Sequence, residues 1–373
     1  MTEADLLGLA SISVEFEQIQ VRENEVPELK MLQESAPCQV RGGTDTGAGK
    51  VNILLQAYIS RNYIEDFALV SDMGFVAQNA GRVVRALLEI AFAKKWATAA
   101  LSLTSLSKAI ESESRTPCSL VQSADVCAER MWPFEHPLRQ CDLPAHTMHE
   151  LEQWADDYAV EDLAAMSDAD IGKLIHQNER IGAIVGKAAR EFPTLTLSHS
   201  IQPLSHDMLR VSVALKMAFE WSDKRHGASQ AFWIWVEDED SEHILQMTRV
   251  VIRHGMTDLR HSFLIPFTTI PSKLFIRVVS DRWIAAEDVH EVLLDDLVVP
   301  PPPPPPTPLL ELPLLTAADT LRDEIPRALY SKEHAAFDPV VTQAFHTIYH
   351  TSSNALICTT SSSRSILGEL AIW

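Results

Sequence analysis

The stretch M-G-F-V-A-Q-N-A-G-R-V-V-R-A-L-L-E-I-A-F-A-K-K-W, residues 73–96, predicts one long amphipathic helix. At about 100° per residue, one side carries the apolar residues of a core-facing surface: Val76, Ala80, Val83, Val84, Leu87 and Ala91. The opposite side carries a narrow polar stripe: Gln78, Arg82, Arg85, Glu89 and Trp96. Arginines, an amide and an aromatic ring are groups that hold single-stranded nucleic acid by phosphate contact and base stacking. From composition alone, a solvated face is the favoured interpretation of this stripe.

The chain as a whole is acidic. Its 373 residues are 46% hydrophobic and carry a formal net charge of −20. This length and apolar content are enough for roughly two or three globular domains. A free-standing nucleic-acid binder needs a basic footprint, so the charge argues against one. Any nucleic-acid contact must therefore be a small local patch, or must depend on a partner domain.

The cysteines and hydrophobic runs indicate an intracellular protein in the cytoplasm, the nucleus or both. The five cysteines are odd in number and form no C-x-x-C pair, which is typical of reduced thiols. The first residues, M-T-E-A-D-L-L-G-L-A, lack the pattern of a signal peptide. No run approaches the ~18 consecutive apolar residues of a membrane span. We expect a soluble chain without membrane contact.

Two polar clusters could suggest a metal. Cys141, His146 and His149 lie close in sequence, but no fourth ligand follows at the usual zinc spacing, so we expect a surface cluster and no metal. The acidic run E-D-E-D-S-E, residues 237–242, is most simply a solvated turn, and a cation site is the open alternative.

Changes in hydrophobic period predict a multidomain α plus β fold. Residues 1–154 form a helical bundle, and 155–193 form two short helices around a turn, like a helix-hairpin-helix. Residues 194–299 are short β-rich runs typical of an immunoglobulin- or fibronectin-type sandwich. A proline linker, 300–308, leads to a last segment, 309–373, which we expect to be the truncated start of a RecA-like α/β domain.

Two segments have the look of phosphate-binding loops. Residues 42–51, G-G-T-D-T-G-A-G-K-V, have the wrong glycine spacing and follow no apolar strand, so we interpret them as a flexible linker. At the C-terminus, N-A-L-I (354–357) is predicted as a short buried strand and I-L-G-E-L-A-I-W (366–373) as the start of a helix. The polar loop between them has no glycine, and Arg364 stands where a lysine is expected. Without glycine the backbone amides cannot easily cradle phosphates, so ATP binding is not expected here.

Several motifs together resemble one helicase family. G-K-V-N-I-L-L-Q-A-Y-I-S-R (49–61), V-A-Q-N-A-G-R-V-V-R-A-L-L-E-I (76–90), H-G-A-S-Q-A-F-W-I-W-V-E-D (226–238) and F-I-R-V-V-S-D-R-W (275–283) are similar to the Sec sixty-three (Brl) unit of the tandem-cassette superfamily-two helicases. F-D-P-V-V-T-Q-A-F-H-T-I-Y-H-T (337–351) resembles the start of their second motor. The motifs lean towards the activating signal cointegrator and ribosome quality-control trigger branch, with the spliceosomal unwindase branch as a close second.

The resemblance implies a role for the long helix. In this family it acts as a ratchet beside the exiting strand, which implies that Gln78, Arg82 and Arg85 face nucleic acid. The partners implied are single-stranded RNA or DNA, RecA-like motor domains, and other proteins that bind the β-sandwich.

The chain also departs from the family pattern. The family's adenine-binding motif has two glutamines, and Val341 replaces the first of them, so only Gln343 remains. The resemblance implies that Gln343, Arg364 and Ser365 are the degenerate remnant of an ATP site. We therefore expect no catalytic residue and no cofactor bound by this chain alone, whereas the full-length family uses ATP and magnesium. Residues 112–128 have no counterpart in the family and are predicted to be a disordered insertion.

The leading hypothesis is a strand-guiding, partner-binding appendage of an ATP-dependent RNA helicase that is inactive as an ATPase alone. A non-enzymatic interaction scaffold is the second hypothesis, and the net charge favours it. A translocation component of the endoplasmic reticulum, which shares the same unit, is the third. The absence of a J-domain signature and of any membrane span weighs against it.

Overall fold

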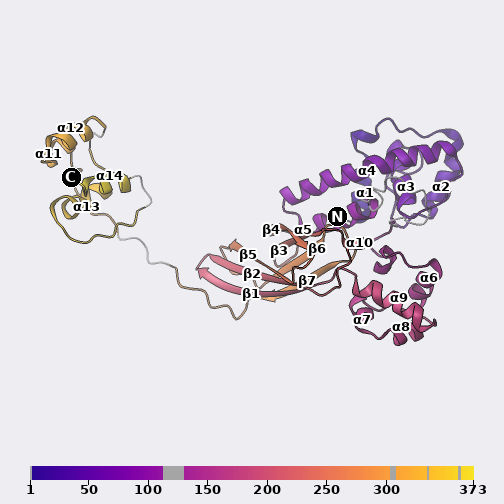
Figure 1. The fold of residues 1–373 in the computed structure, drawn as a ribbon. Coiled ribbons are helices and arrows are strands. Elements are labelled where there is room, and N and C mark those ends of the chain that lie inside the picture. The colour runs from indigo at the N-terminus through magenta and orange to yellow at the C-terminus, as the bar shows by residue number, and fades with distance from the viewer. Residues whose placement is uncertain (1, 112–129, 303–307, 334–335, 360–362) are drawn as a thin grey trace. The chain divides into compact units, whose positions relative to one another are not determined.

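The computed structural model describes residues 2–111, 130–302, 308–333, 336–359 and 363–373. The chain divides into two compact units, Met1–Pro301 and Pro302–Trp373 (Figure 1). The predicted insertion at 112–128 lies outside the described residues. The described part of the chain is a mixture of α-helices and antiparallel β-sheets, as the hydrophobic periods predict.

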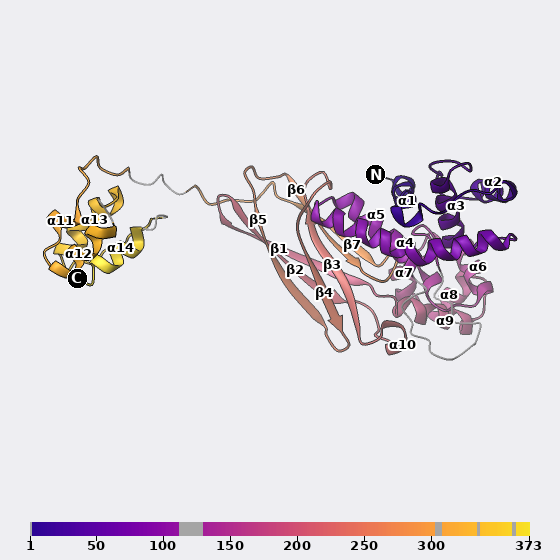
Figure 2. The same ribbon diagram turned by 90° about the horizontal axis from the view of Figure 1, so that it is seen from above.

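The N-terminal part of the first unit is a helical bundle. It contains α1 (Glu3–Ser11), η1 (Val14–Phe16), η2 (Glu23–Glu25), α2 (Val26–Glu34), α3 (Gly47–Ile59), α4 (Phe67–Ala93) and α5 (Ala97–Glu111). Figure 2 shows α4 as the long helix of the bundle, with α5 beside it. Helix α4 begins six residues before the predicted start at residue 73, because the Asp66 carboxylate accepts hydrogen bonds from the backbone N–H groups of Ala68 and Leu69.

Trp96 does not belong to α4, which corrects the predicted stripe. The helix ends at Ala93, and Lys95 has a φ of +60°, which turns the chain out of the helix. Trp96 then forms an isolated antiparallel bridge with His243, and the Ile244 N–H donates to the Lys95 carbonyl at 2.8 Å. Trp96 therefore lies in the turn between α4 and α5, and this turn contacts the sandwich.

Residues 42–51 are not a flexible linker. Thr46 caps the N-terminus of α3, and Gly49 packs so closely on the preceding loop that a Cβ there would lie 1.7 Å from the Gly43 carbonyl oxygen. The Lys50 ammonium is fully buried, 2.5 Å from a Glu25 carboxylate oxygen and 2.6 Å from Asp72. The glycines of this segment therefore permit close packing of a helix N-terminus.

A compact group of short helices follows: η3 (Pro137–Gln140), α6 (Ala145–Trp154), α7 (Val160–Ala165), α8 (Asp168–Leu174) and α9 (Glu179–Arg190). Helices α8 and α9 approach very closely, because a Cβ on Gly182 would lie 2.0 Å from the Asp168 carbonyl oxygen and 2.7 Å from the Gly172 nitrogen. Ser167 caps α8, as its sequence position predicts.

Two antiparallel sheets form a sandwich. The strands are β1 (Leu195–Ser205), β2 (Met208–Met217), β3 (Ser229–Glu237), β4 (Ile244–Arg253), β5 (Asp258–Pro266), β6 (Lys273–Ser280) and β7 (Glu287–Leu293), with a short helix, α10 (Asp223–His226), after β2. Among the described residues, one sheet has the order β1-β2-β5 and the other β4-β3-β6-β7. Alternate residues of both sheets face a shared core that includes Val211, Ile234 and Ile276.

The second unit is helical in its described residues: α11 (Ala317–Thr320), α12 (Glu324–Glu333), α13 (Pro339–His350) and α14 (Ser363–Leu370) pack around a small core. The strand predicted at 354–357 is wrong, since these residues have no regular structure and Leu356 is 91% exposed. A strand needs a partner, and the described part of this unit holds no second strand. The described residues of this unit therefore form helices but not the strand that was expected of a RecA-like α/β start.

Candidate nucleic-acid interface

The three residues of the polar stripe that were predicted to face nucleic acid, Gln78, Arg82 and Arg85, lie on α4, but they differ in their surroundings. Gln78 and Arg82 are exposed, and the Arg82 side chain retains 69% of its accessible surface. The Arg82 Nη2 donates to Glu15 and to Asn79, each at 3.2 Å. Both partners are themselves near the surface, so these bonds are weak and can exchange for a phosphate.

Arg85 lies at the junction between the bundle and the sandwich. Its side chain is 29% exposed, and its Nη1 is 3.3 Å from the Oδ1 of Asp281, in the loop after β6. Asp281 is 8% exposed and also accepts hydrogen bonds from Arg249 at 3.0 Å and from the Trp233 indole at 3.1 Å. Arg85 is therefore held against the sandwich, whereas Arg82 projects into solvent.

The Asp281 carboxylate is stabilised in its ionised form. Burial alone would raise its pKa, but the hydrogen bonds from Arg249 and Trp233 and the nearby charge of Arg85 outweigh this effect and lower the pKa. Next to this ion cluster, the Phe92 ring of α4 lies 4.7 Å from the Trp233 ring and 6.1 Å from the Trp235 ring. Polar and aromatic contacts together fix the C-terminal half of α4 on the sheet.

The loop of residues 281–286 joins all three parts of the first unit. Asp281 contacts α4, and the buried Trp283 packs with Phe192 of the short-helix group. The Lys108 ammonium of α5 donates to the Trp283 carbonyl at 3.1 Å. Gln140 both donates to the Ile284 carbonyl at 2.9 Å and accepts from its N–H at 2.8 Å. Sequence reasoning missed this role, although the loop lies within and just after the S-D-R-W motif.

The residues predicted to be the remnant of an ATP site lie on two helices of the second unit, Gln343 on α13 and both Arg364 and Ser365 on α14. The Gln343 side-chain oxygen accepts a hydrogen bond from the Leu310 N–H at 2.8 Å, so this side chain fixes the backbone just after the proline linker. Arg364 and Ser365 are exposed in the first turn of α14. The preceding residue, Ser363, donates to Asp338, the N-cap of α13.

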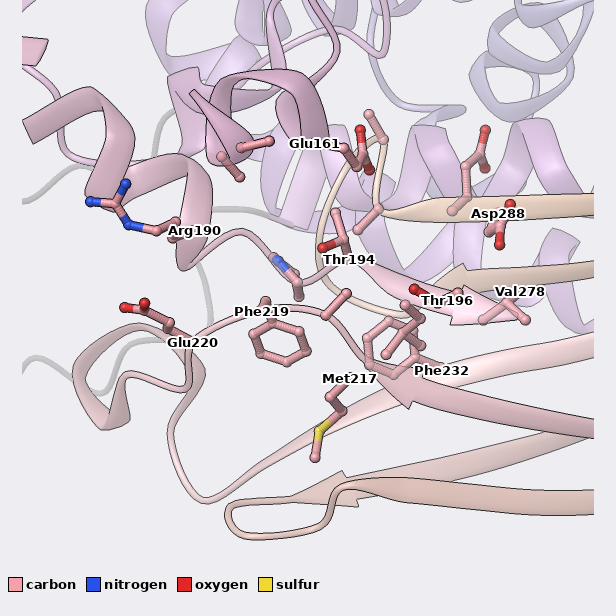
Figure 3. Close-up of a pocket in the computed structure, with 18 residues that line it drawn as sticks. Glu161, Arg190, Thr194, Thr196, Met217, Phe219, Glu220, Phe232, Val278 and Asp288 are labelled. Atoms are coloured by element: carbon pink, nitrogen blue, oxygen red, sulfur yellow. The ribbon is translucent and has the colours of Figure 1, made fainter. Parts of the chain in front are cut away.

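A pocket of about 830 Å³ lies between the short helices and the sandwich (Figure 3). In Figure 3, Phe219 and Phe232 lie in the middle of the lining residues, with Glu161 and Asp288 above them and Met217 below. The 18 lining residues include no histidine, cysteine, serine or lysine. None of the predicted site residues lines this pocket.

Within the described ranges, no three His, Cys, Asp or Glu side chains are grouped as a metal site would require. Cys141 is buried rather than part of a surface cluster, and burial raises the pKa of its thiol to about 11. His146 and His149 are exposed. Among the described helices, none combines the length and apolarity needed to cross a bilayer.

Comparisons with known proteins identify the family. The model of the Sec63 Brl domain matches residues 1–293. The whole chain is 38% identical to "Activating signal cointegrator 1 complex subunit 3" of Bos taurus and covers 16% of it. It is 35% identical to the "RQC trigger complex helicase SLH1" of Saccharomyces cerevisiae, of which it covers 18%. It is 36% identical to the human "U5 small nuclear ribonucleoprotein 200 kDa helicase", of which it covers 17%.

These relatives match the two branches predicted from the motifs, and the chain spans less than a fifth of the length of each, between 16% and 18%. The match of 1–293 takes in the bundle, the short helices and the sandwich through β7. The chain belongs to the Sec63 Brl domain family and is homologous to a segment of each of these relatives.

Proposed function

We propose that this chain is the strand-guiding appendage of an ATP-dependent RNA helicase. The observation that carries the proposal is the exposed part of the polar stripe, Gln78 and Arg82. These residues lie on α4, whose N-terminus is capped by Asp66 and whose C-terminal half packs on the sandwich through Phe92. Two of the matched relatives are named helicases. A guanidinium and an amide on a rigid, solvent-facing helix can hold a phosphate and a base edge of a passing strand.

In this proposal Arg85 positions the helix. Its ion pair with Asp281 and the contact of the Phe92 ring with the Trp233 ring hold α4 on the sandwich. A strand that contacts Gln78 and Arg82 then meets groups whose separation does not change. Arg85 reaches nucleic acid directly only if its pair with Asp281 opens.

The remaining parts fit the same role. The close glycine approach of α8 and α9 supports a helix-hairpin-helix, and the strand orders support a fibronectin-type sandwich that docks partner proteins. RecA-like motor domains outside this chain hydrolyse ATP and step the strand. Gln343, Arg364 and Ser365 supply no phosphate cradle, so the chain alone has no ATPase activity. We place the protein in the cytoplasm, the nucleus or both.

The second candidate is an interaction scaffold without nucleic-acid contact. The net charge of −20 favours it, because long-range repulsion opposes a polyanion. The two functions differ in what Arg82 does, since a scaffold needs no exposed cation on α4.

Fluorescence anisotropy with labelled single-stranded RNA, at a low and at a physiological salt concentration, tests the proposal. The substitution Arg82→Glu should weaken binding roughly tenfold, the cost of losing one charged hydrogen bond. The matched control is Arg260→Glu, which makes the same charge change on an 83% exposed side chain of β5 and should leave binding unchanged. Arg85→Glu is a poor probe because it places a carboxylate beside Asp281. Absence of RNA binding by the unchanged chain at low salt would favour the scaffold.

A further inference from the structure

A second pocket, of about 840 Å³, opens at one end of the sandwich. Three turns surround it: the β1–β2 turn with Asp207, the β3–β4 turn with residues 238–240, and the β5–β6 loop that begins after Pro266. The floor is apolar and comes from both sheets, including Leu209, Leu245 and Leu274. A core that is open to solvent at one end is the usual form of a binding site for a bulky apolar side chain.

The rim of this pocket is acidic. Asp207, Asp238, Glu239 and Asp240 line it together with His206, and none of the described lining residues is a lysine or an arginine. The Ser205 hydroxyl donates to Asp207 at 2.7 Å, and this hydrogen bond lowers the pKa of the carboxyl. This hydrogen bond favours the ionised form of Asp207.

Cations on the neighbouring elements are already engaged elsewhere. Arg277 pairs with Glu237 at 2.7 Å and Lys273 with Glu291 at 2.9 Å. Lys95 donates to the Leu245 backbone carbonyl at 3.1 Å. Asp238 accepts hydrogen bonds from the backbone of residues 242 and 243, and Glu239 accepts from Ser272, so a cation supplied from outside would share these two carboxylates with their present donors.

We infer that this end of the sandwich docks a segment of a partner protein in which basic residues flank a bulky apolar side chain. The apolar side chain enters between Leu245 and Leu274, and the flanking lysines or arginines meet the rim carboxylates. The inference rests on the proposed partner-binding role of the sandwich. It does not depend on nucleic-acid contact by α4.

Peptide titration of the full chain tests this inference by fluorescence anisotropy. The probe is a labelled peptide K-K-L-F-K-K, and the controls are E-E-L-F-E-E and K-K-S-S-K-K. The first should bind in a salt-sensitive manner, and the other two should not, because each lacks one half of the match. Equal binding of K-K-L-F-K-K and K-K-S-S-K-K would overturn the inference, since only general charge attraction would then be at work.

A pair of variants places the site. Asp207→Lys combined with Asp240→Lys should weaken K-K-L-F-K-K binding about fivefold or more, as expected for two reversed rim charges. Asp258→Lys, at the opposite end of β5, should not weaken it. Equal losses in both proteins would place the peptide elsewhere. Displacement of the peptide by calcium chloride at constant ionic strength would show a cation site and also overturn the inference. None of these results depends on whether Arg82 binds RNA.

Discussion

Arg85 and Asp281 lie 196 positions apart in the chain, yet the Arg85 Nη1 is 3.3 Å from the Asp281 Oδ1. This pair joins the long helix α4 to the loop between β6 and β7. The same carboxylate accepts hydrogen bonds from Arg249 and Trp233, and the same loop contacts α5, η3 and the short-helix group. The first unit is consequently a frame in which one loop fixes the position of the helix proposed to guide nucleic acid.

Loss of the Asp281 charge should loosen this frame. In Asp281→Asn, the amide presents a donor to Arg249, Trp233 or Arg85, which are all donors. We expect the free energy of unfolding to fall by about 2 kcal/mol, measured by urea unfolding. Asp296→Asn, on the exposed end of the sandwich, is the control and should change it by less than about 0.5 kcal/mol. An unchanged stability in Asp281→Asn would show that the cluster does not hold the frame.

The buried ion cluster at the start of α3 should be essential for folding of the bundle. Lys50→Met leaves the fully buried Glu25 carboxylate without its ammonium partner, and we expect a loss of about 3–5 kcal/mol. Adding Glu25→Gln removes the buried carboxylate charge, which then has Arg22 as its charged partner, and should restore part of this loss. Lys173→Met, at a 79% exposed ammonium on α8, serves as the reference and should have little effect. Urea unfolding of the four proteins makes the comparison.

Two glycine-to-alanine substitutions should change the stability of the protein in opposite directions. Gly182→Ala places a methyl group 2.0 Å from the Asp168 carbonyl oxygen, so the short helices must separate, and we expect a loss of about 1–3 kcal/mol. Gly74→Ala, on an exposed position of α4 with no atom within 4 Å, should instead stabilise by about 0.5–1 kcal/mol. Thermal unfolding followed by circular dichroism separates the two. A stabilising Gly182→Ala would contradict the close approach of α8 and α9.

Lys108 should make the free energy of unfolding depend on pH in the alkaline range. Burial lowers the pKa of its ammonium to about 8, against about 10.4 in an unfolded chain. Between these values the unfolded chain binds more protons than the folded one, so the free energy of unfolding rises with pH, with a slope of up to about 1.4 kcal/mol per pH unit. Lys108→Met should remove this contribution.

Urea unfolding at pH 8, 9 and 10 measures the slope in both proteins. Other titrating groups, such as Cys141, contribute equally to the slope in both proteins. Their contribution therefore cancels when one slope is subtracted from the other. Equal slopes in the wild-type chain and in Lys108→Met would rule out a lowered pKa for Lys108.

Periodicity predicted the sandwich well because its strands alternate between core and solvent. The strands β1 to β7 of the structure all lie within residues 194–299, where short β-rich runs were predicted. The long helix was also evident from its apolar side, and only its ends were misplaced. These features depend on local sequence, so they can be predicted without a structure.

Features that depend on distant contacts were misjudged. The glycines at 42–51 indicated a linker, but they serve close packing around the buried Lys50. Residues 354–357 have the composition of a strand and no neighbouring strand to pair with in the described part of their unit. Within the polar stripe, spacing alone could not distinguish Arg82 from Arg85, because the partner of Arg85 lies in a loop of the sandwich.

The salt dependence of RNA binding tests the central proposal most directly. For a single strand, each phosphate contact contributes about 0.7 to the slope of log K against log salt concentration. Anisotropy titrations over a series of salt concentrations should therefore give a slope that is smaller by about 0.7 in Arg82→Glu than in the unchanged chain, while Arg260→Glu keeps the original slope. The same slope in all three proteins would contradict a phosphate contact by Arg82 on α4.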